Sequence, residues 1–314
     1  MILIACVSIN EVSITEIPKS STPIAQPAII PIQNVLSFIE LSGQITDPKA
    51  ELSGLGWYGD TLILLPQYPH RFDDKDGAFF AIPKQEILDY INGNNLNPIE
   101  PRLVHLNAPG LKKSIENFQG YEAIAFHGDQ VFLTIEAGKS DNMHAYLVSG
   151  IIKDDLSEIN LDSTHIVEIP LPIQSKGRTY EALMIVNNTI LTFFEINNDT
   201  APAAQVFDLN LNLLGTMPFP ILNHRLTDAA IIDTNSFWVI NQMTSNNPED
   251  QVEQLIKMNY SPDGITLADI PAIQLKVDSQ NSYKWEGLAL LDNLGFLLVT
   301  DKEPSTILAF MNMP

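Results

Sequence analysis

One place in a repeated sequence pattern carries side chains that could bind a metal ion. In each copy, an acid or serine stands between a large or polar residue and a Gly or Ala that opens an apolar run. Carboxylate and hydroxyl oxygens are the ligands that calcium prefers, and calcium takes about six to eight of them. A second interpretation is that each acid accepts hydrogen bonds from neighbouring backbone N–H groups. The five residues at this place are Ser53, Glu122, Glu181, Asp228 and Glu286.

A second set of polar residues follows each copy after a tight-turn signal and another apolar run. The turns consist of Gly-Asp, Asn-Asn or related residues, which tolerate the positive φ of a hairpin. Because a hairpin returns the end of its second strand to the start of its first, we expect the two sets to form adjacent shells at one face. The second set is Gln67, Glu136, Glu195, Gln242 and Asp301.

The basic residues are few, and several lie beside these acids. Arg178 precedes Glu181 by three residues, and Arg225 precedes Asp228 by three. Alternating acids and bases can hold a metal and an anionic ligand together. The predicted metal ligands are Glu122, Glu181, Asp228, Glu286 and Asp301. The predicted ligand-binding residues are Arg71, Arg178, Arg225 and Lys302, and the candidate acid/base groups are Glu136, Glu195, His70 and His224.

The five copies read as hairpins, and weaker strands with period-two alternation lie between them. Four strands per unit at a period of about 40–50 residues is typical of a β-propeller blade. We therefore predict an all-β chain with a single propeller over residues 34–314, five-bladed, or six-bladed if the longest interval between copies conceals a degenerate unit. The first strand of each blade lines the central channel, so the acids should gather at one channel mouth.

The chain ends one strand short of a complete last blade. Residues 34–43, "NVLSFIELSG", precede the first copy and are expected to supply the outer strand. This closure would leave no unpaired edge in the ring. The pattern indicates a helix only at "PKQEILDYI", residues 83–91.

The composition excludes some classes of partner. Of 314 residues, 38 are Asp or Glu and 17 are Lys or Arg, which gives a formal net charge of −21. A chain this acidic repels phosphate backbones and anionic membranes, so we predict no nucleic-acid binding. The sequence holds no apolar run of eighteen residues, so no transmembrane helix is expected.

The N-terminal 33 residues read as a separate segment. Leu3 to Cys6, "LIAC", is similar to the lipobox of bacterial lipoproteins, in which the cysteine carries a lipid. The alternative is an apolar start with a chance cysteine. A stretch with three prolines, residues 19–33, reads as a tether. We expect a monomer in the periplasm or at the cell surface, lipid-anchored through Cys6 or secreted.

The segments "ELSGLGWYGDTLIL", "YEAIAFHGDQVFLTIE" and "WEGLALLDNLGFLLVTDKE" resemble those of phytase-like β-propellers. A weaker similarity runs to calcium-activated nucleotidases, which are five-bladed propellers. The resemblance implies an extracytoplasmic propeller with calcium at its axis and, in some members, phosphoester hydrolysis. It places Glu122, Glu181, Asp228 and Glu286 as the metal-facing set, while Ser53 and Gln67 depart from the acids of the pattern.

Two functions follow from this interpretation. The favoured one is a cell-envelope propeller that binds a small anionic ligand or an envelope partner at an acidic, calcium-binding channel mouth. The alternative is a calcium-dependent phosphoester hydrolase in which Arg178 and Arg225 hold the anion and Glu136 or Glu195 acts as base. The binding function is preferred because nothing in the sequence identifies a nucleophile or a general base.

Overall fold

The structure is a computed structural model, and it describes residues 36–173, 176–195, 203–243, 245, 252–275, 283–302 and 305–313. The lipobox-like Cys6 and the proline-rich residues 19–33 lie outside these ranges. Within them almost all regular structure is β-strand, as the alternating patterns predict.

The strands form antiparallel units of four in sequence order. Blade 1 consists of β2 (Leu52–Tyr58), β3 (Thr61–Pro66), β4 (Ala78–Pro83) and β5 (Arg102–Asn107). Blade 2 consists of β6 (Phe118–His127), β7 (Gln130–Lys139), β8 (Asn142–Ile152) and β9 (Glu158–Ile169). Blade 3 consists of β10 (Tyr180–Val186), β11 (Thr189–Phe194), β12 (Ala203–Asp208) and β13 (Leu213–Pro218).

Blade 4 consists of β14 (Arg225–Asp233), β15 (Ser236–Met243), β16 (Val252–Ser261) and β17 (Gly264–Leu267), and the short β18 (Ile273–Gln274) also pairs with β16. Blade 5 consists of β19 (Trp285–Leu291), β20 (Gly295–Thr300), β21 (Leu308–Asn312) and, from the other end of the chain, β1 (Leu36–Ile39). The short helices are η1 (Gly43–Thr46), η2 (Pro69–Arg71), α1 (Lys84–Ile91) and α2 (Leu111–Ser114).

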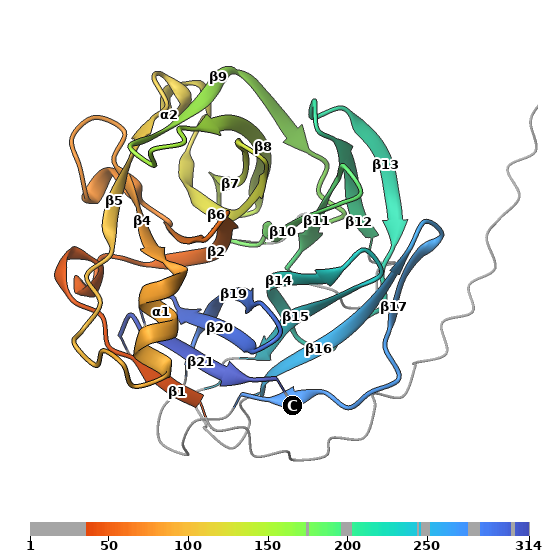
Figure 1. Ribbon diagram of the computed structural model, residues 1–314. Helices are drawn as coiled ribbons and strands as arrows, with labels where there is room; N and C mark the ends of the chain where they lie inside the picture. Colours follow the sequence, from red (N-terminus) through yellow and green to blue (C-terminus); the bar gives the residue numbers. More distant parts are fainter. Residues whose placement is uncertain are drawn as a thin grey trace, which may run out of the picture.

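The first strands of the blades close a ring. Strand β2 contacts β6, β6 contacts β10, β10 contacts β14, β14 contacts β19, and β19 returns to β2. Figure 1 looks along the axis of this ring, with the outer strands β5, β9, β13 and β17 at its rim. The described residues thus form a β-propeller of five blades.

The predicted closure of the last blade is confirmed. Strand β1 pairs antiparallel with β21, from Leu36 opposite Met311 to Ile39 opposite Leu308. The pairing covers the edge that β21 would otherwise expose to other chains. Ile39 is buried among apolar residues of blades 1 and 5.

The long first interval of the repeat holds a helix and an extra sheet connection. Strand β5 pairs in parallel with β9, with His105 opposite Glu158, and so joins the outer edges of blades 1 and 2. The helix expected at residues 83–91 is α1, Lys84–Ile91. Within the described chain this interval contains no sixth blade.

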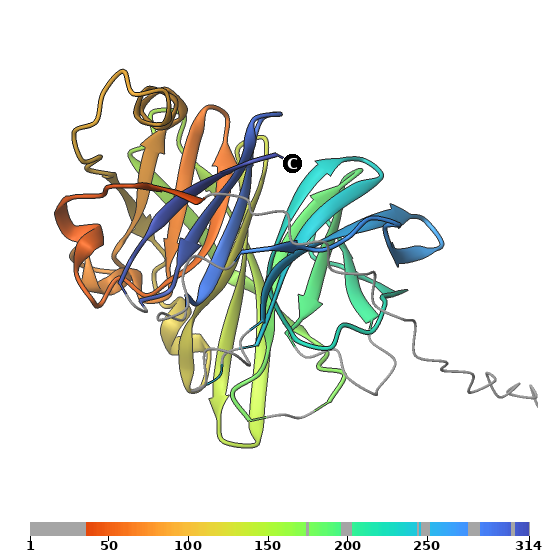
Figure 2. The same ribbon diagram turned by 90° about the horizontal axis from the view of Figure 1, so that it is seen from below.

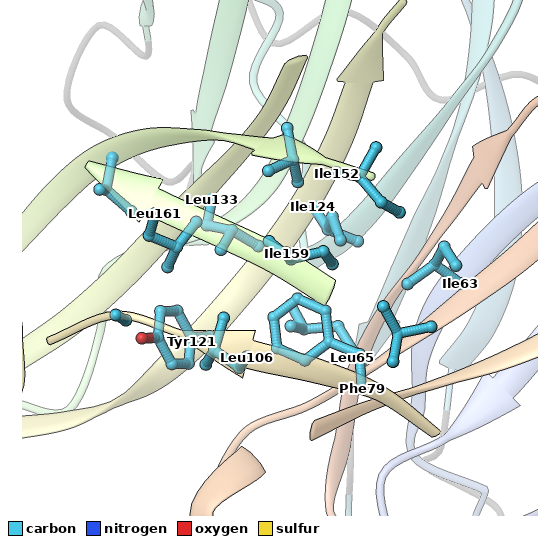
Figure 3. Close-up of a cluster of buried hydrophobic side chains, with 14 of the residues drawn as sticks. Ile63, Leu65, Phe79, Leu106, Tyr121, Ile124, Leu133, Ile152, Ile159 and Leu161 are labelled. Carbon is cyan, nitrogen blue, oxygen red and sulfur yellow. The ribbon is translucent and has the colours of Figure 1, made fainter. Parts of the chain in front are cut away.

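The core lies between the blades, where apolar sheet faces pack on one another. Between blades 1 and 2 it contains Ile63, Leu65 and Phe79 from one side and Tyr121 and Leu133 from the other. Figure 3 shows these side chains pointing into a common layer. Alternation places every second residue of a strand on such a face, which explains the period-two pattern of the sequence.

Candidate functional site at the acid end of the channel

In most blades the residue at the acid position of the repeat is the extra residue of a β-bulge. In blades 1, 2, 3 and 5 the register between the first two strands skips one residue. A bulge leaves its extra residue unpaired and re-aims its side chain. We call the channel end where the first strands begin the acid end. The skipped residues are Ser53, Glu122, Glu181 and Glu286.

Blade 4 departs from the expected equivalence by one residue. There Leu226 pairs with Asn241 and Asp228 pairs with Ile240, so the bulge falls on Thr227. By register, Asp228 corresponds to the small residue that follows the acid in the other blades. A second bulge between Ile231 and Asp233 adds one more residue to β14. Asp228, and not Thr227, therefore has the spacing to Gln242 that the repeat predicts, so the sequence gave no sign of the offset.

Small residues at that place have a packing reason. A Cβ on Gly287 would lie 2.6 Å from Cγ1 of Val299 and 3.2 Å from the carbonyl carbon of Gly54. The first strands therefore approach one another closely here. Asp228 places a carboxyl group one residue deeper into the channel than the glutamates.

The surroundings of Asp228 are those of a structural acceptor. Its Oδ2 accepts the N–H of Leu288 at 2.6 Å, and its Oδ1 accepts the N–H of Ala229 at 2.8 Å. Burial raises its pKa well above the ordinary range, and the backbone N–H groups of Leu288, Ala229 and Leu55 act in the opposite direction. Asp228 thus ties blades 4, 5 and 1 across the axis and fits the structural interpretation of the acid.

The second set links each blade to the next. The carbonyl of Gln67 accepts the N–H of Tyr121, and its side-chain amide donates to Oε1 of Glu122 at 2.9 Å. Thr179 donates to Oε2 of Glu136 at 3.0 Å. In the same way the Gln242 amide donates to the carbonyl of Trp285 at 3.0 Å. The two sets therefore form adjacent shells, as predicted, and the second shell joins neighbouring blades.

Glu195 is the centre of an ion-pair network. It is fully buried, and its Oε1 contacts the guanidinium groups of both Arg178 and Arg225. Arg225 also lies 3.9 Å from Oε1 of Glu286. The other carboxylate oxygen of Glu195, Oε2, has no hydrogen-bond partner among the described residues. Both arginines predicted to hold an anionic ligand are thus engaged with a carboxylate of the protein.

Burial and mutual repulsion raise the pKa values of the glutamates. Burial, and then Glu136, raise the pKa of Glu122 well above its usual range. Burial, and then Glu195 and Glu122, do the same for Glu181. For Glu286 burial raises the pKa to about 8, against the lowering effect of Arg225. These groups interact with one another, so they form one electrostatic cluster.

A further ion-pair group lies beside the cluster. Glu51 binds Arg71 at 3.2 Å and Lys302 at 3.1 Å. The guanidinium of Arg71 also lies over the Tyr68 ring at 4.0 Å. The repeat pattern did not identify Glu51, because Glu51 stands two residues before the acid position, which Ser53 occupies in blade 1. The only sign in the sequence that another acid serves this blade was the absence of an acid at Ser53. Asp301 continues the second shell, and its carbonyl accepts the N–H of Leu52.

His70 and His224, the two candidate acid/base histidines, make no hydrogen bond to the glutamate cluster among the described residues. His70 lines a separate cavity of about 180 Å³ with Lys75, Asp76 and Lys112. Burial lowers the pKa of His70, and it also lowers the pKa of His224, which is half-buried before β14. The structure gives neither histidine an acid/base role, and that role stays a prediction.

The side chains at the acid end provide the type of donor atom that calcium binds. Glu122, Glu181 and Glu286 supply the oxygen atoms that calcium prefers, and a cation would offset the repulsion that raises their pKa values. In the described part of the chain no three His, Cys, Asp or Glu side chains are arranged to hold a metal ion. The donor types therefore fit, and metal binding would require the glutamate side chains to turn toward a common centre.

None of the helices in the described residues is long and apolar enough to cross a membrane. No family model matches the chain, and no match was found among curated protein sequences.

Solved structures resemble this chain at very low sequence identity. An exo-1,5-alpha-L-arabinanase from a bovine ruminal metagenomic library has a TM-score of 0.51 at 8% identity, over 88% of this chain and 96% of that one. A glucose dehydrogenase has a TM-score of 0.47 at 9% identity, over 89% and 99%. The periplasmic gluconolactonase of Pseudomonas aeruginosa has a TM-score of 0.42 at 10% identity, over 82% and 70%. The arabinanase supports the β-propeller fold; a fold carries no function by itself.

Proposed function

We propose that this protein is a ligand-binding β-propeller whose acid end binds a divalent cation, with calcium as the first candidate. The observation that carries the proposal is the excess of buried carboxyl groups. Among the described residues, the positive charges that act on this cluster are those of Arg178, Arg225 and Lys284. Six carboxyl groups face them, those of Glu122, Glu136, Glu181, Glu195, Asp228 and Glu286.

Such an excess is unfavourable unless the carboxyl groups take up protons or a cation. Asp228 and Glu195 are held by backbone N–H groups and by arginines, so they are poor candidates for ligands. Of the other four, Glu136 belongs to the second set and accepts the hydroxyl of Thr179. We assign the cation to the three glutamates of the first set, Glu122, Glu181 and Glu286. A bound cation would provide a charged centre to which a small anionic ligand could bind at the channel mouth.

The binding function is favoured over phosphoester hydrolysis. Hydrolysis would require free guanidinium groups to hold the phosphoryl oxygens, and Arg178 and Arg225 both contact Glu195. The envelope location and the lipid anchor at Cys6 remain part of the proposal. Mass spectrometry of the protein purified from its host membrane fraction would test for lipid on Cys6.

Calcium titration tests the cation site. We expect saturable heat by calorimetry and a rise in melting temperature, since a ligand at about 100 times its Kd stabilises by about 2.7 kcal/mol. Glu181→Gln should abolish both effects, while Asp269→Asn, which removes an exposed acid after β17, should leave them unchanged. Absence of heat and of any shift in melting temperature with calcium, magnesium or manganese would refute the proposal.

A further inference from the structure

The opposite end of the channel holds a cavity of about 320 Å³. All five first strands contribute to its wall, and the side chains are mostly apolar. Its size is at the lower limit of small-molecule pockets, which are typically lined by apolar and aromatic groups with a few polar ones. We call it the apolar cavity, and its lining includes Trp57, Ile124, Phe126, Met184, Ile231 and Leu290.

The apolar cavity is separate from the acid end. Leu55, Ala229 and Leu288 lie in its wall, and their N–H groups point to the carboxyl group of Asp228. Asp228 itself does not line the cavity. The offset register of blade 4 therefore places a hydrogen-bonded carboxyl group between the two ends of the channel.

The aromatic side of the cavity is held in place. The indole N–H of Trp57 donates to the carbonyl of Leu290 at 2.8 Å, across the boundary between blades 1 and 5. Tyr58 and Phe126 pack with ring centroids 5.7 Å apart, and Tyr58 donates to Asp129 at 2.9 Å. A rigid aromatic wall of this kind costs little conformational entropy when a ligand binds.

The rim of the cavity already binds one ammonium group. The Nζ of Lys84 lies 5.1 Å from the centre of the Trp57 ring, 2.9 Å from Asp60 and 3.0 Å from Asp292. The two carboxylates raise the pKa of Lys84. An aromatic face flanked by carboxylates is the environment that attracts organic cations. Lys84 belongs to α1, the orange helix at one end of the ring in Figure 2.

The charge of the rim also favours a cation. The turns that follow the first strands lie around this end, and they carry Asp60, Asp129, Asp233 and Asp292. Lys84 neutralises only part of this charge. Together with the net charge of −21, the acidic rim attracts positively charged molecules and repels anions.

We propose that the apolar cavity binds a small organic cation, an amine with a compact hydrocarbon or aromatic body. The body fills the space between Trp57, Phe126 and Met184, and the ammonium group lies at the rim beside Asp292. The proposal does not depend on the cation site at the acid end, because the two lie at opposite ends of the channel.

Three probes of similar shape and different charge test it: phenethylammonium, 2-phenylethanol and phenylacetate. Binding is followed by calorimetry and by tryptophan fluorescence, since Trp57 lines the cavity whereas Trp238 and Trp285 are buried in another cluster. We expect phenethylammonium to bind saturably and with at least about tenfold higher affinity than the other two. Equal affinity for phenylacetate, or no saturable binding of any probe, overturns the proposal.

Variants at the wall and the rim distinguish the cavity from other surfaces. Ala125→Leu fills the cavity and should abolish binding. Asp292→Asn should weaken binding by about two- to fivefold, as expected for an exposed ion pair. Lys84→Gln should strengthen it by a similar factor, because it releases two carboxylates and one face of Trp57.

Asp269→Asn is the matched control, since it removes one exposed acid elsewhere and should leave the affinity unchanged. Asp292 and Lys84 lie at the rim, so their variants test the proposal even where Ala125→Leu fails to fold. Unchanged affinity in both rim variants overturns it.

Discussion

Glu286→Gln tests the electrostatics of the acid end most directly. Burial raises the pKa of Glu286 from 4.5 to about 8. The folded protein therefore retains this proton in a range where the unfolded chain has released it. With a raised folded pKa, stability is present below pH 4.5 and is lost as the pH rises toward 8.

The size of the effect follows from linkage. At pH 7 the unfolded chain gains about 3 kcal/mol by ionising a carboxyl group of pKa 4.5 that the fold keeps protonated. Glu286→Gln replaces the protonated acid with a neutral group of the same shape. The variant should therefore match the wild type near pH 4.5 and exceed its stability by about 3 kcal/mol at pH 7.

The assay is denaturant unfolding in EDTA at several pH values between 4.5 and 8, followed by circular dichroism. Glu122 and Glu181 also have raised pKa values, so the variant should still lose some stability with pH, at a smaller slope than the wild type. Parallel curves for the two proteins, or a wild type whose stability rises with pH, would refute the reasoning. In excess calcium the slope of the wild type should diminish, because the cation favours the ionised carboxylates.

Three further predictions concern stability. Asp228→Ala leaves the N–H groups of Leu288 and Leu55 without their acceptor and should lower the free energy of unfolding by about 3 kcal/mol, whereas Asp228→Asn, which keeps one carbonyl oxygen, should cost less; urea unfolding compares them. Glu195→Gln removes the carboxylate that pairs two arginines and should cost about 3–5 kcal/mol, measured in the same way, with Glu168→Gln on an exposed strand position as the control. Ile39→Ala in β1 should cost about 3 kcal/mol if the N-terminal strand closes the ring; a loss below about 1 kcal/mol, comparable to that of an exposed residue, would contradict that role.

The repeat pattern was informative because propeller blades obey local rules. Alternation identifies the strands, and Gly, Asn and Asp identify the hairpin turns. The pairing of β1 with β21 also followed from the sequence, since a blade with a missing strand must obtain it from the other terminus. A hairpin returns the end of its second strand to the start of its first, so the sequence also placed Glu122 and Glu136 at one channel end.

The network around Glu195 could not be read from the sequence. Arg178 and Arg225 stand close to other acids in the sequence, yet both contact Glu195, which directly follows β11 and is fully buried. A buried carboxylate requires positive charge beside it. The pairing of Arg71 with Glu51 likewise depends on which side chains the fold brings within reach.

The sequence by itself determined the strands, their grouping into blades, the closure of the ring and the gathering of acids at one face. These features depend on residue period and on turn chemistry, which are local. The tertiary structure decided the register of blade 4, the role of Asp228 and the existence of the apolar cavity. Both bulges of blade 4 add a residue to β14, so Asp228 has the same spacing to Gln242 as the acids of blades 2 and 3 have to their second-set residues. Only the register and the hydrogen bonds across the axis therefore reveal that Asp228 lies one residue deeper than its apparent equivalents.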